Sequence, residues 1–139
     1  MTSGHGDLSK ASLLSPQELE QSVVITDPSQ PDNPMIFISD EFEEQTGYSP
    51  AESLGKNCRF LQGPETDPEA IEAIRRALAE KDELTIDILN YAKDGSQFWN
   101  RLRIRPLYGD DGEVLFFAGA QNPIGELEVR TSPTRSITD

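Results

Sequence analysis

The sequence predicts an α+β domain in which helices cover one face of a five-stranded antiparallel sheet. Short apolar runs at residues 23–26 and 35–39 are expected to be strands near the N-terminus. Longer runs at 84–92, 98–108 and 114–122 place apolar residues on one face and are joined by Asp- and Gly-containing links typical of hairpins. A strand pair followed by helices and a three-strand meander favours one sheet with helices packed on it.

Capping signals predict the helices between and before these strands. Residues 15–21 and 49–55 each begin with an N-cap Ser, a Pro at the first helical position and a Glu three residues after the cap. Residues 39–47 are expected to form another short helix that ends at a glycine. The clearest helix is predicted over 68–81, with an apolar stripe formed by Ile71, Ile74 and Leu78.

Length, charge and cysteine usage limit the domain organisation, the partners and the cellular location that can be expected. Residues 23–123 are expected to form one domain, with 1–22 a frayed tail and short flanking helix, and 124–139 a helix start followed by disorder. A net charge of −13 disfavours nucleic acid and acidic lipid as partners. Because there is no membrane-length apolar run or export leader, and only one cysteine, a cytoplasmic location away from membranes is expected.

The strand faces place three primary amides on the apolar side of the sheet. With a three-residue loop at 94–96, Asn90 is expected to lie opposite Asn100. With a four-residue loop at 109–112, Asn100 is expected to lie opposite Gln121. The three amides would then form a line across three neighbouring strands.

Amides on an apolar face are costly unless they are hydrogen-bonded, at about 1–3 kcal/mol for each unpaired group. They could bond to one another or to buried water. Because each amide has two donors and two acceptors, a flat ligand with alternating donors and acceptors suits the line better, and the pyrimidine edge of a flavin is such a group. Gly119, in the neighbouring row, leaves room beside a flat ligand.

Two arginines and one thiol add to this picture. Arg75 borders the apolar stripe of the long helix and Arg59 directly follows Cys58, so the pair suits a phosphate and favours flavin mononucleotide (FMN) over riboflavin. A lone cysteine is more often a small buried hydrophobe than a reagent. Nucleophilic catalysis and a metal site are both disfavoured, because the single histidine, His5, lies far away in the N-terminal segment.

The residues around Cys58 read GKNCRFLQG, which resembles the signature of the LOV (light, oxygen, voltage) subgroup of PAS domains. The resemblance extends over about residues 23–122, to phototropin-type and bacterial short LOV domains. The other matching positions are Asp27-Pro28, Asp32-Asn33-Pro34, Thr46-Gly47-Tyr48, Lys93-Asp94-Gly95, Asn100-Arg101-Leu102, Pro106 and Phe117-Ala118-Gly119-Ala120-Gln121.

The resemblance implies an FMN chromophore and a photocycle without substrate turnover, and therefore not an enzyme. Cys58 would be the photoactive thiol that bonds reversibly to flavin carbon 4a under blue light. Gln121 would contact ring oxygen 4 and nitrogen 5 and reorient, while Arg59 and Arg75 hold the phosphate. The remaining positions implied are Asn57 and Gln62 at the ribityl chain or ring, Asn90 and Asn100 at the pyrimidine edge, and Val24, Thr26, Leu61, Ile71, Ile88, Leu102, Ile104 and Phe117 in the apolar lining.

The output is expected to be a change in self-association or in the binding of an unidentified downstream protein, because no effector domain fits outside 23–122. The outer sheet face is predicted to carry Trp99, Phe116, Ala118 and Ala120, an apolar patch that needs a terminal helix or a second subunit as cover. A homodimer through this face is expected. The alternative functions are a flavin-binding PAS thiol redox sensor, a PAS module for another ligand, and a flavin electron-transfer protein.

Overall fold

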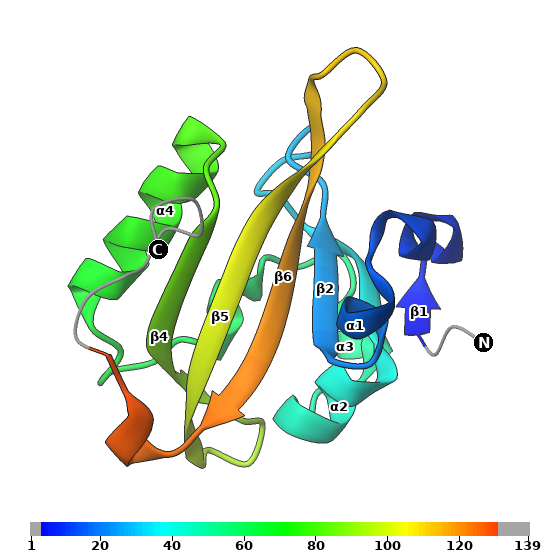
Figure 1. The fold of residues 1–139 in the computed structure, drawn as a ribbon. Helices are drawn as coiled ribbons and strands as arrows, with labels where there is room; N and C mark the ends of the chain where they lie inside the picture. Colours follow the sequence, from blue (N-terminus) through cyan, green and yellow to red (C-terminus); the bar gives the residue numbers. More distant parts are fainter. Residues whose placement is uncertain (1–3, 131–139) are drawn as a thin grey trace.

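The computed structural model describes residues 4–130, which form one six-stranded antiparallel sheet with helices on both faces (Figure 1). The predicted α+β class is confirmed, but the sheet has a sixth strand at its edge. Across the sheet the strands follow the order β1-β3-β2-β6-β5-β4. They are β1 (Gly4–Gly6), β2 (Ser22–Thr26), β3 (Met35–Ser39), β4 (Leu84–Tyr91), β5 (Gln97–Tyr108) and β6 (Val114–Ile124).

The helices are short except for α4 (Pro68–Glu80), and they form where the capping signals predict them. Helices α1 (Pro16–Leu19) and α3 (Pro50–Ser53) both begin with a capping box, and α2 (Asp40–Thr46) ends at a left-handed glycine. In the part of the chain that the structure describes, no helix has the length and apolarity needed to cross a bilayer. Two 3-10 turns, η1 (Leu8–Leu13) and η2 (Cys58–Leu61), were not predicted from the sequence. A third, η3 (Glu126–Glu128), lies where the sequence predicted a helix start, and the disorder predicted for 131–139 falls outside the described residues.

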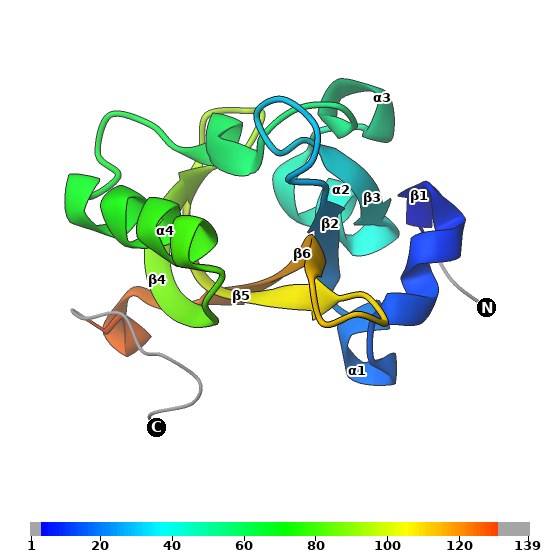
Figure 2. The same cartoon turned by 90° about the horizontal axis from the view of Figure 1, so that it is seen from above.

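Helices α2, α3 and α4 lie on one side of the curved sheet, whereas α1 lies on the opposite side (Figure 2). The main helices cover one face, as predicted, and α1 is the predicted short flanking helix that precedes the domain. We call the face under α2, α3 and α4 the inner face and the other the outer face. On the inner face, α4 packs against Ile86 and Ile88 of β4 and Leu102 of β5 through Ile74 and its alanines, Ala70, Ala73 and Ala77.

Both hairpin registers differ from the predicted ones by two residues. Asn100 lies opposite Ile88 and Pro123, instead of opposite Asn90 and Gln121. A shift of two residues leaves every side chain on its predicted face, because side chains alternate with a period of two. The three amides therefore share the inner face, as predicted, but they are staggered and not in line.

The turn glycines explain the shift. Gly95 has φ 89° and Gly112 has φ 83°, and each occupies the last position of a three-residue loop, 93–95 or 110–112. This left-handed conformation is readily adopted only by glycine, so the glycine fixes where each loop ends. A further bulge at 107/108 offsets the second hairpin.

The N-terminal segment is ordered over its described part, contrary to the predicted frayed tail; residues 1–3 lie outside the description. Strand β1 pairs with β3, and His5 Nε2 lies 2.8 Å from Asp40 Oδ1. Ala11 and Leu14 of the next segment pack into the outer-face core, which also contains Ala118 and Ala120. Spacing of three residues lets Ala11 and Leu14 point the same way from a 3-10 turn, so they cover the sheet together.

Two arginines of β5 bind the terminal segments to the outer face. Arg105 donates to the Glu18 carboxylate of α1, with Nε to Oε2 at 2.8 Å, and this pairing lowers the pKa of Glu18 against the opposing effect of burial. Arg101 binds Asp87 of β4 and the backbone oxygen of Glu128. The chain itself therefore covers much of the face on which a second subunit was expected. Phe116, Ala118 and Ala120 are covered by the N-terminal segment, which is the alternative to a second subunit.

Replacing Leu14 by Ala should lower the free energy of unfolding by about 2–4 kcal/mol, because it removes a buried leucine from the outer-face core. The matched control is Leu13→Ala, since the Leu13 side chain is 38% exposed and its backbone oxygen would remain available to Arg105. Chemical denaturation followed by circular dichroism gives both values. Equal losses for the two variants would show that the N-terminal segment does not pack as described.

Candidate functional site

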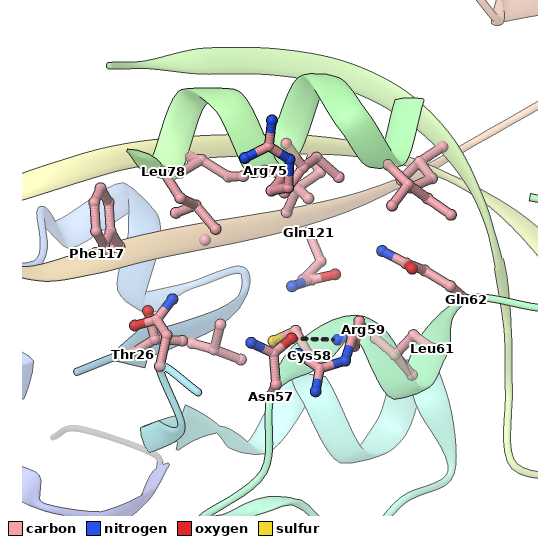
Figure 3. A pocket seen from close by; sticks show the side chains of 18 of the residues that line it. Thr26, Asn57, Cys58, Arg59, Leu61, Gln62, Arg75, Leu78, Phe117 and Gln121 are labelled. Carbon is pink, nitrogen blue, oxygen red and sulfur yellow. Dashed lines mark hydrogen bonds between the residues drawn. The ribbon is translucent and has the colours of Figure 1, made fainter. Parts of the chain in front are cut away.

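A cavity of about 350 Å³ lies between α4, η2 and the inner face of the sheet (Figure 3). Its size falls within the range of small-molecule binding sites, about 300–1,000 Å³. All but one of the site residues predicted from the sequence line this cavity. They are Val24, Thr26, Asn57, Cys58, Arg59, Leu61, Gln62, Ile71, Arg75, Ile88, Asn90, Leu102, Ile104, Phe117, Gly119 and Gln121.

Cys58 is the first residue of η2 and faces the cavity. The turn is capped by Asn57, whose Oδ1 accepts from the backbone N–H of Arg59 at 2.9 Å (Figure 3). The cysteine packs against the core that contains Val24 and Leu61. Burial raises the pKa of the Cys58 thiol to about 12, so at neutral pH the group is a thiol and not a thiolate.

The predicted residue that does not line the cavity is Asn100. It is fully buried and donates both amide hydrogens to its neighbours, to Asn90 Oδ1 at 3.0 Å and to Gln121 Oε1 at 2.6 Å. Its own Oδ1 accepts from the backbone N–H of Asn122 at 2.9 Å. Asn100 therefore orients the two amides that line the cavity, and its own bond to a ligand edge stays a prediction.

The amides at the cavity wall retain hydrogen-bonding capacity. Asn90 Nδ2 makes one bond, to the backbone oxygen of Leu89 at 3.2 Å. The Gln121 side chain reaches into the cavity from β6, and its Nε2 is near Gly119, where an added Cβ would lie 4.0 Å away (Figure 3). One edge of the cavity thus offers amide donors and acceptors, while most other walls are apolar.

Arg59 and Arg75 reach the cavity from opposite walls, η2 and α4, and each is paired with a carboxylate (Figure 3). Arg59 donates through both terminal nitrogens to Asp32, with Nη1 to Oδ1 at 2.7 Å, and this lowers the pKa of Asp32. Arg75 Nε donates to Glu72 Oε1 at 2.9 Å. Exposed ion pairs contribute little to stability, so either arginine can exchange its carboxylate for a phosphate at low cost.

The structure adds Asn33, Ile74, Leu78 and Ala118 to the lining. Ile74 and Leu78 extend the α4 wall that the helix pattern already indicated, whereas the strand pattern had placed Ala118 on the outer face. Asn33 has φ 48°, and its buried Oδ1 has no hydrogen-bond partner. Its position after Asp32 in a proline-flanked loop gave no periodic signal that could have identified it as a site residue.

These features together fit a flat, largely apolar molecule with a polar edge and an anionic tail. The amides of Asn90 and Gln121 meet the edge, the unpaired oxygen of Asn33 calls for a donor, and two arginines stand where an anion could bind. Among residues 4–130 there is no group of three or more His, Cys, Asp or Glu side chains that could hold a metal ion.

Comparison with known proteins identifies the family. Residues 20–124 match the model of the PAS domain family. A solved structure from work on a flavin analogue and the Light-Oxygen-Voltage domain mechanism is 47% identical, with a TM-score of 0.78 and 87% of each chain covered. This chain is a LOV domain of the PAS family. The resemblance seen in the GKNCRFLQG motif is thereby confirmed.

Two curated relatives of the LOV domain are bacterial light receptors. The blue-light photoreceptor of Listeria monocytogenes is 50% identical over 118 residues, covering 84% of this chain and 46% of that protein. The blue-light-activated histidine kinase of Rhizobium johnstonii is 46% identical over 129 residues, covering 84% of this chain and 37% of the kinase. The matched region covers less than half the length of each of these two relatives.

The Cys58 thiol of the folded LOV domain should react with Ellman's reagent at pH 8 about a thousandfold more slowly than a free cysteine, because its raised pKa leaves little thiolate. The same sample in guanidinium chloride should react completely within minutes. The release of thionitrobenzoate at 412 nm measures both rates. Rapid reaction of the folded protein would mean that the thiol is not desolvated.

Proposed function

We propose that this LOV domain binds FMN and acts as a blue-light photoreceptor through a reversible covalent bond between Cys58 and the flavin. The supporting observation is that a neutral, desolvated thiol shares one apolar cavity with a pair of hydrogen-bonding amides. When bound, the flavin would supply the light-excited state, the ring carbon to which the thiol sulfur adds, and the ring nitrogen 5 that takes up the proton released when the S–H bond breaks. This source of activation explains why the thiol needs no neighbouring base.

The side chains have separate tasks in this proposal. Arg59 and Arg75 hold the phosphate, and Asn90 and Gln121 bond to the polar ring edge in the positions fixed by Asn100. The apolar lining, including Ile88, Leu102 and Phe117, excludes water from the ring. Gln121 can present either its NH2 or its oxygen by rotating the amide, so it can follow a change of a ring atom from acceptor to donor.

How the light signal leaves the domain is a separate part of the proposal. We take residues 23–123 as the photosensory unit of a cytoplasmic protein that performs no substrate turnover and signals through self-association or an unidentified protein. A homodimer is still expected, although the outer-face patch that suggested it is largely covered by the N-terminal segment. Sedimentation of dark and illuminated protein tests it, and monomers in both states would count against a dimer.

One measurement, the absorption spectrum before and after blue light, distinguishes the alternative functions. A flavin spectrum that bleaches and then recovers in the dark supports the photoreceptor. A flavin spectrum unchanged by light favours electron transfer or a thiol redox sensor, and protein purified without flavin favours another PAS ligand.

Cys58→Ala should retain flavin but lose reversible bleaching, because the substitution removes the reacting thiol while the pocket volume hardly changes. Absorption near 450 nm, recorded after a blue-light pulse and through dark recovery, checks this expectation. Reversible bleaching with dark recovery in the variant would reject the covalent mechanism.

Replacing Arg59 and Arg75 together by Gln should raise the riboflavin share of the bound flavin, because the charge-assisted hydrogen bonds to the phosphate are lost. Arg76→Gln is the matched control, since Arg76 is on the same helix as Arg75 but does not line the cavity. Chromatography of the extracted cofactor gives the FMN and riboflavin fractions. If the double variant and the control keep the same FMN fraction, the arginines do not bind the phosphate.

A further inference from the structure

A second cavity, which we call the α2 cavity, lies between α2 and the neighbouring ends of β2 and β6. Its volume is about 530 Å³, and its walls include Ser22, Glu41, Gln45, Gln121 and Asn122. Gln121 lines both this cavity and the proposed flavin pocket. The two cavities are therefore neighbours with a hydrogen-bonding side chain as their common wall.

Unpaired polar atoms are concentrated in the α2 cavity. Within the described part of the chain, the buried side-chain atoms that lack a hydrogen-bond partner are Asn33 Oδ1 and four atoms of this cavity. Those four are Ser22 Oγ, Glu41 Oε1, and both Nε2 and Oε1 of Gln45. Ser22 is only 6% exposed, so bulk water cannot satisfy its hydroxyl from outside. Buried polar atoms are rarely left unpaired, and this set therefore calls for an occupant of the cavity.

The chemistry of the four atoms selects water as that occupant. The Gln45 NH2 and the Ser22 hydroxyl donate, whereas the Gln45 oxygen and the Glu41 carboxylate accept. A buried water needs two to four such partners in a polar space large enough to hold it, and the α2 cavity provides both. An anion would meet the carboxylates of Glu41 and Glu44, and an apolar group would leave all four atoms unpaired.

We infer that the α2 cavity holds an ordered water cluster, bound by Gln45, Glu41 and Ser22, that brings solvent to the side chain of Gln121. Ser22 lies directly opposite Gln121 in the β2–β6 register, so the two side chains leave the same face of the sheet as close neighbours. The cavity reaches the surface at the exposed residues Glu44 and Ser96. Water can thus pass from the surface to one wall of the flavin pocket without crossing its apolar lining.

Local sequence on α2 makes the cavity polar. Glu41 and Gln45 are four residues apart and so occupy one side of the helix, while Phe42 and Thr46 are buried on the side that packs on the sheet. The kinetic consequence rests on the proposed function. If FMN occupies the pocket and Cys58 reacts with it, hydration beside Gln121 assists the proton movements of dark recovery.

The first test needs no light and no photochemistry. Exchange of side-chain NH2 protons with water is measured by NMR on uniformly ¹⁵N-labelled protein kept in the dark. The Asn100 amide is the internal reference, because it is fully buried with both hydrogens bound inside the protein. We expect the Gln121 NH2 to exchange at least about tenfold faster than the Asn100 NH2, since water reaches only the former.

Gln45→Leu should slow the exchange of the Gln121 NH2 to near that of Asn100, because it removes two of the four water partners. Glu43→Leu is the matched control, as an exposed residue of the same helix that lines neither cavity. Ser22→Ala provides a second variant if Gln45→Leu does not fold. Slow Gln121 exchange in the wild type, or unchanged exchange in both cavity variants, would overturn the inference.

The rate of dark recovery then tests the water cluster separately from the proposed photoreceptor function. In flavin-loaded protein, Gln45→Leu should slow the recovery at least about threefold while leaving the bleaching amplitude and the Glu43→Leu rate unchanged. A wild type that never bleaches would reject the photoreceptor proposal and leave the exchange result standing. Normal bleaching with equal recovery in all proteins would reject the role of the water cluster in recovery.

Discussion

The buried amide of Asn100 is the interaction on which the site depends. It joins three strands, because its side chain on β5 bonds to Asn90 on β4, to Gln121 on β6 and to the backbone of Asn122. With all its donors and its acceptor used, Asn100 can be buried without penalty, and the low dielectric around it strengthens these bonds. These bonds hold Asn90 and Gln121 at the wall of the cavity and set the amide orientation that Gln121 has in this structure.

Strand β5 links the site to the chain termini. Asn100 and Arg101 are consecutive, so their side chains leave opposite faces of the sheet. On the inner face Asn100 orients the cavity amides, and on the outer face Arg101 holds Asp87 together with the segment at Glu128. Four residues further along β5, Arg105 holds the N-terminal segment through Glu18. A displacement of β5 or β6 at the site would therefore act directly on the contacts that hold both terminal segments.

Two cavities of different polarity meet at Gln121. The proposed flavin pocket is largely apolar, which keeps the Cys58 thiol protonated and would shield a flavin ring from water. The α2 cavity is polar, with four unpaired atoms within reach of solvent. A rotating amide can serve both environments, because it offers a donor and an acceptor at nearly the same place.

The sequence by itself determined the fold class, the helix starts and the face on which each strand residue lies. Capping residues such as Ser15 and Ser49 act within one turn, and alternation along a strand needs no knowledge of its partner, so these features are local. The resemblance to LOV domains over about residues 23–122 likewise indicated most of the cavity lining. The registers, the position of Asn100 behind the cavity, the unpaired oxygen of Asn33, the outer-face cover by Leu14 and the α2 cavity were decided only by the tertiary structure. Each depends on residues distant in sequence, or on which loop position a glycine such as Gly95 takes, and periodicity along a single segment carries no information about either.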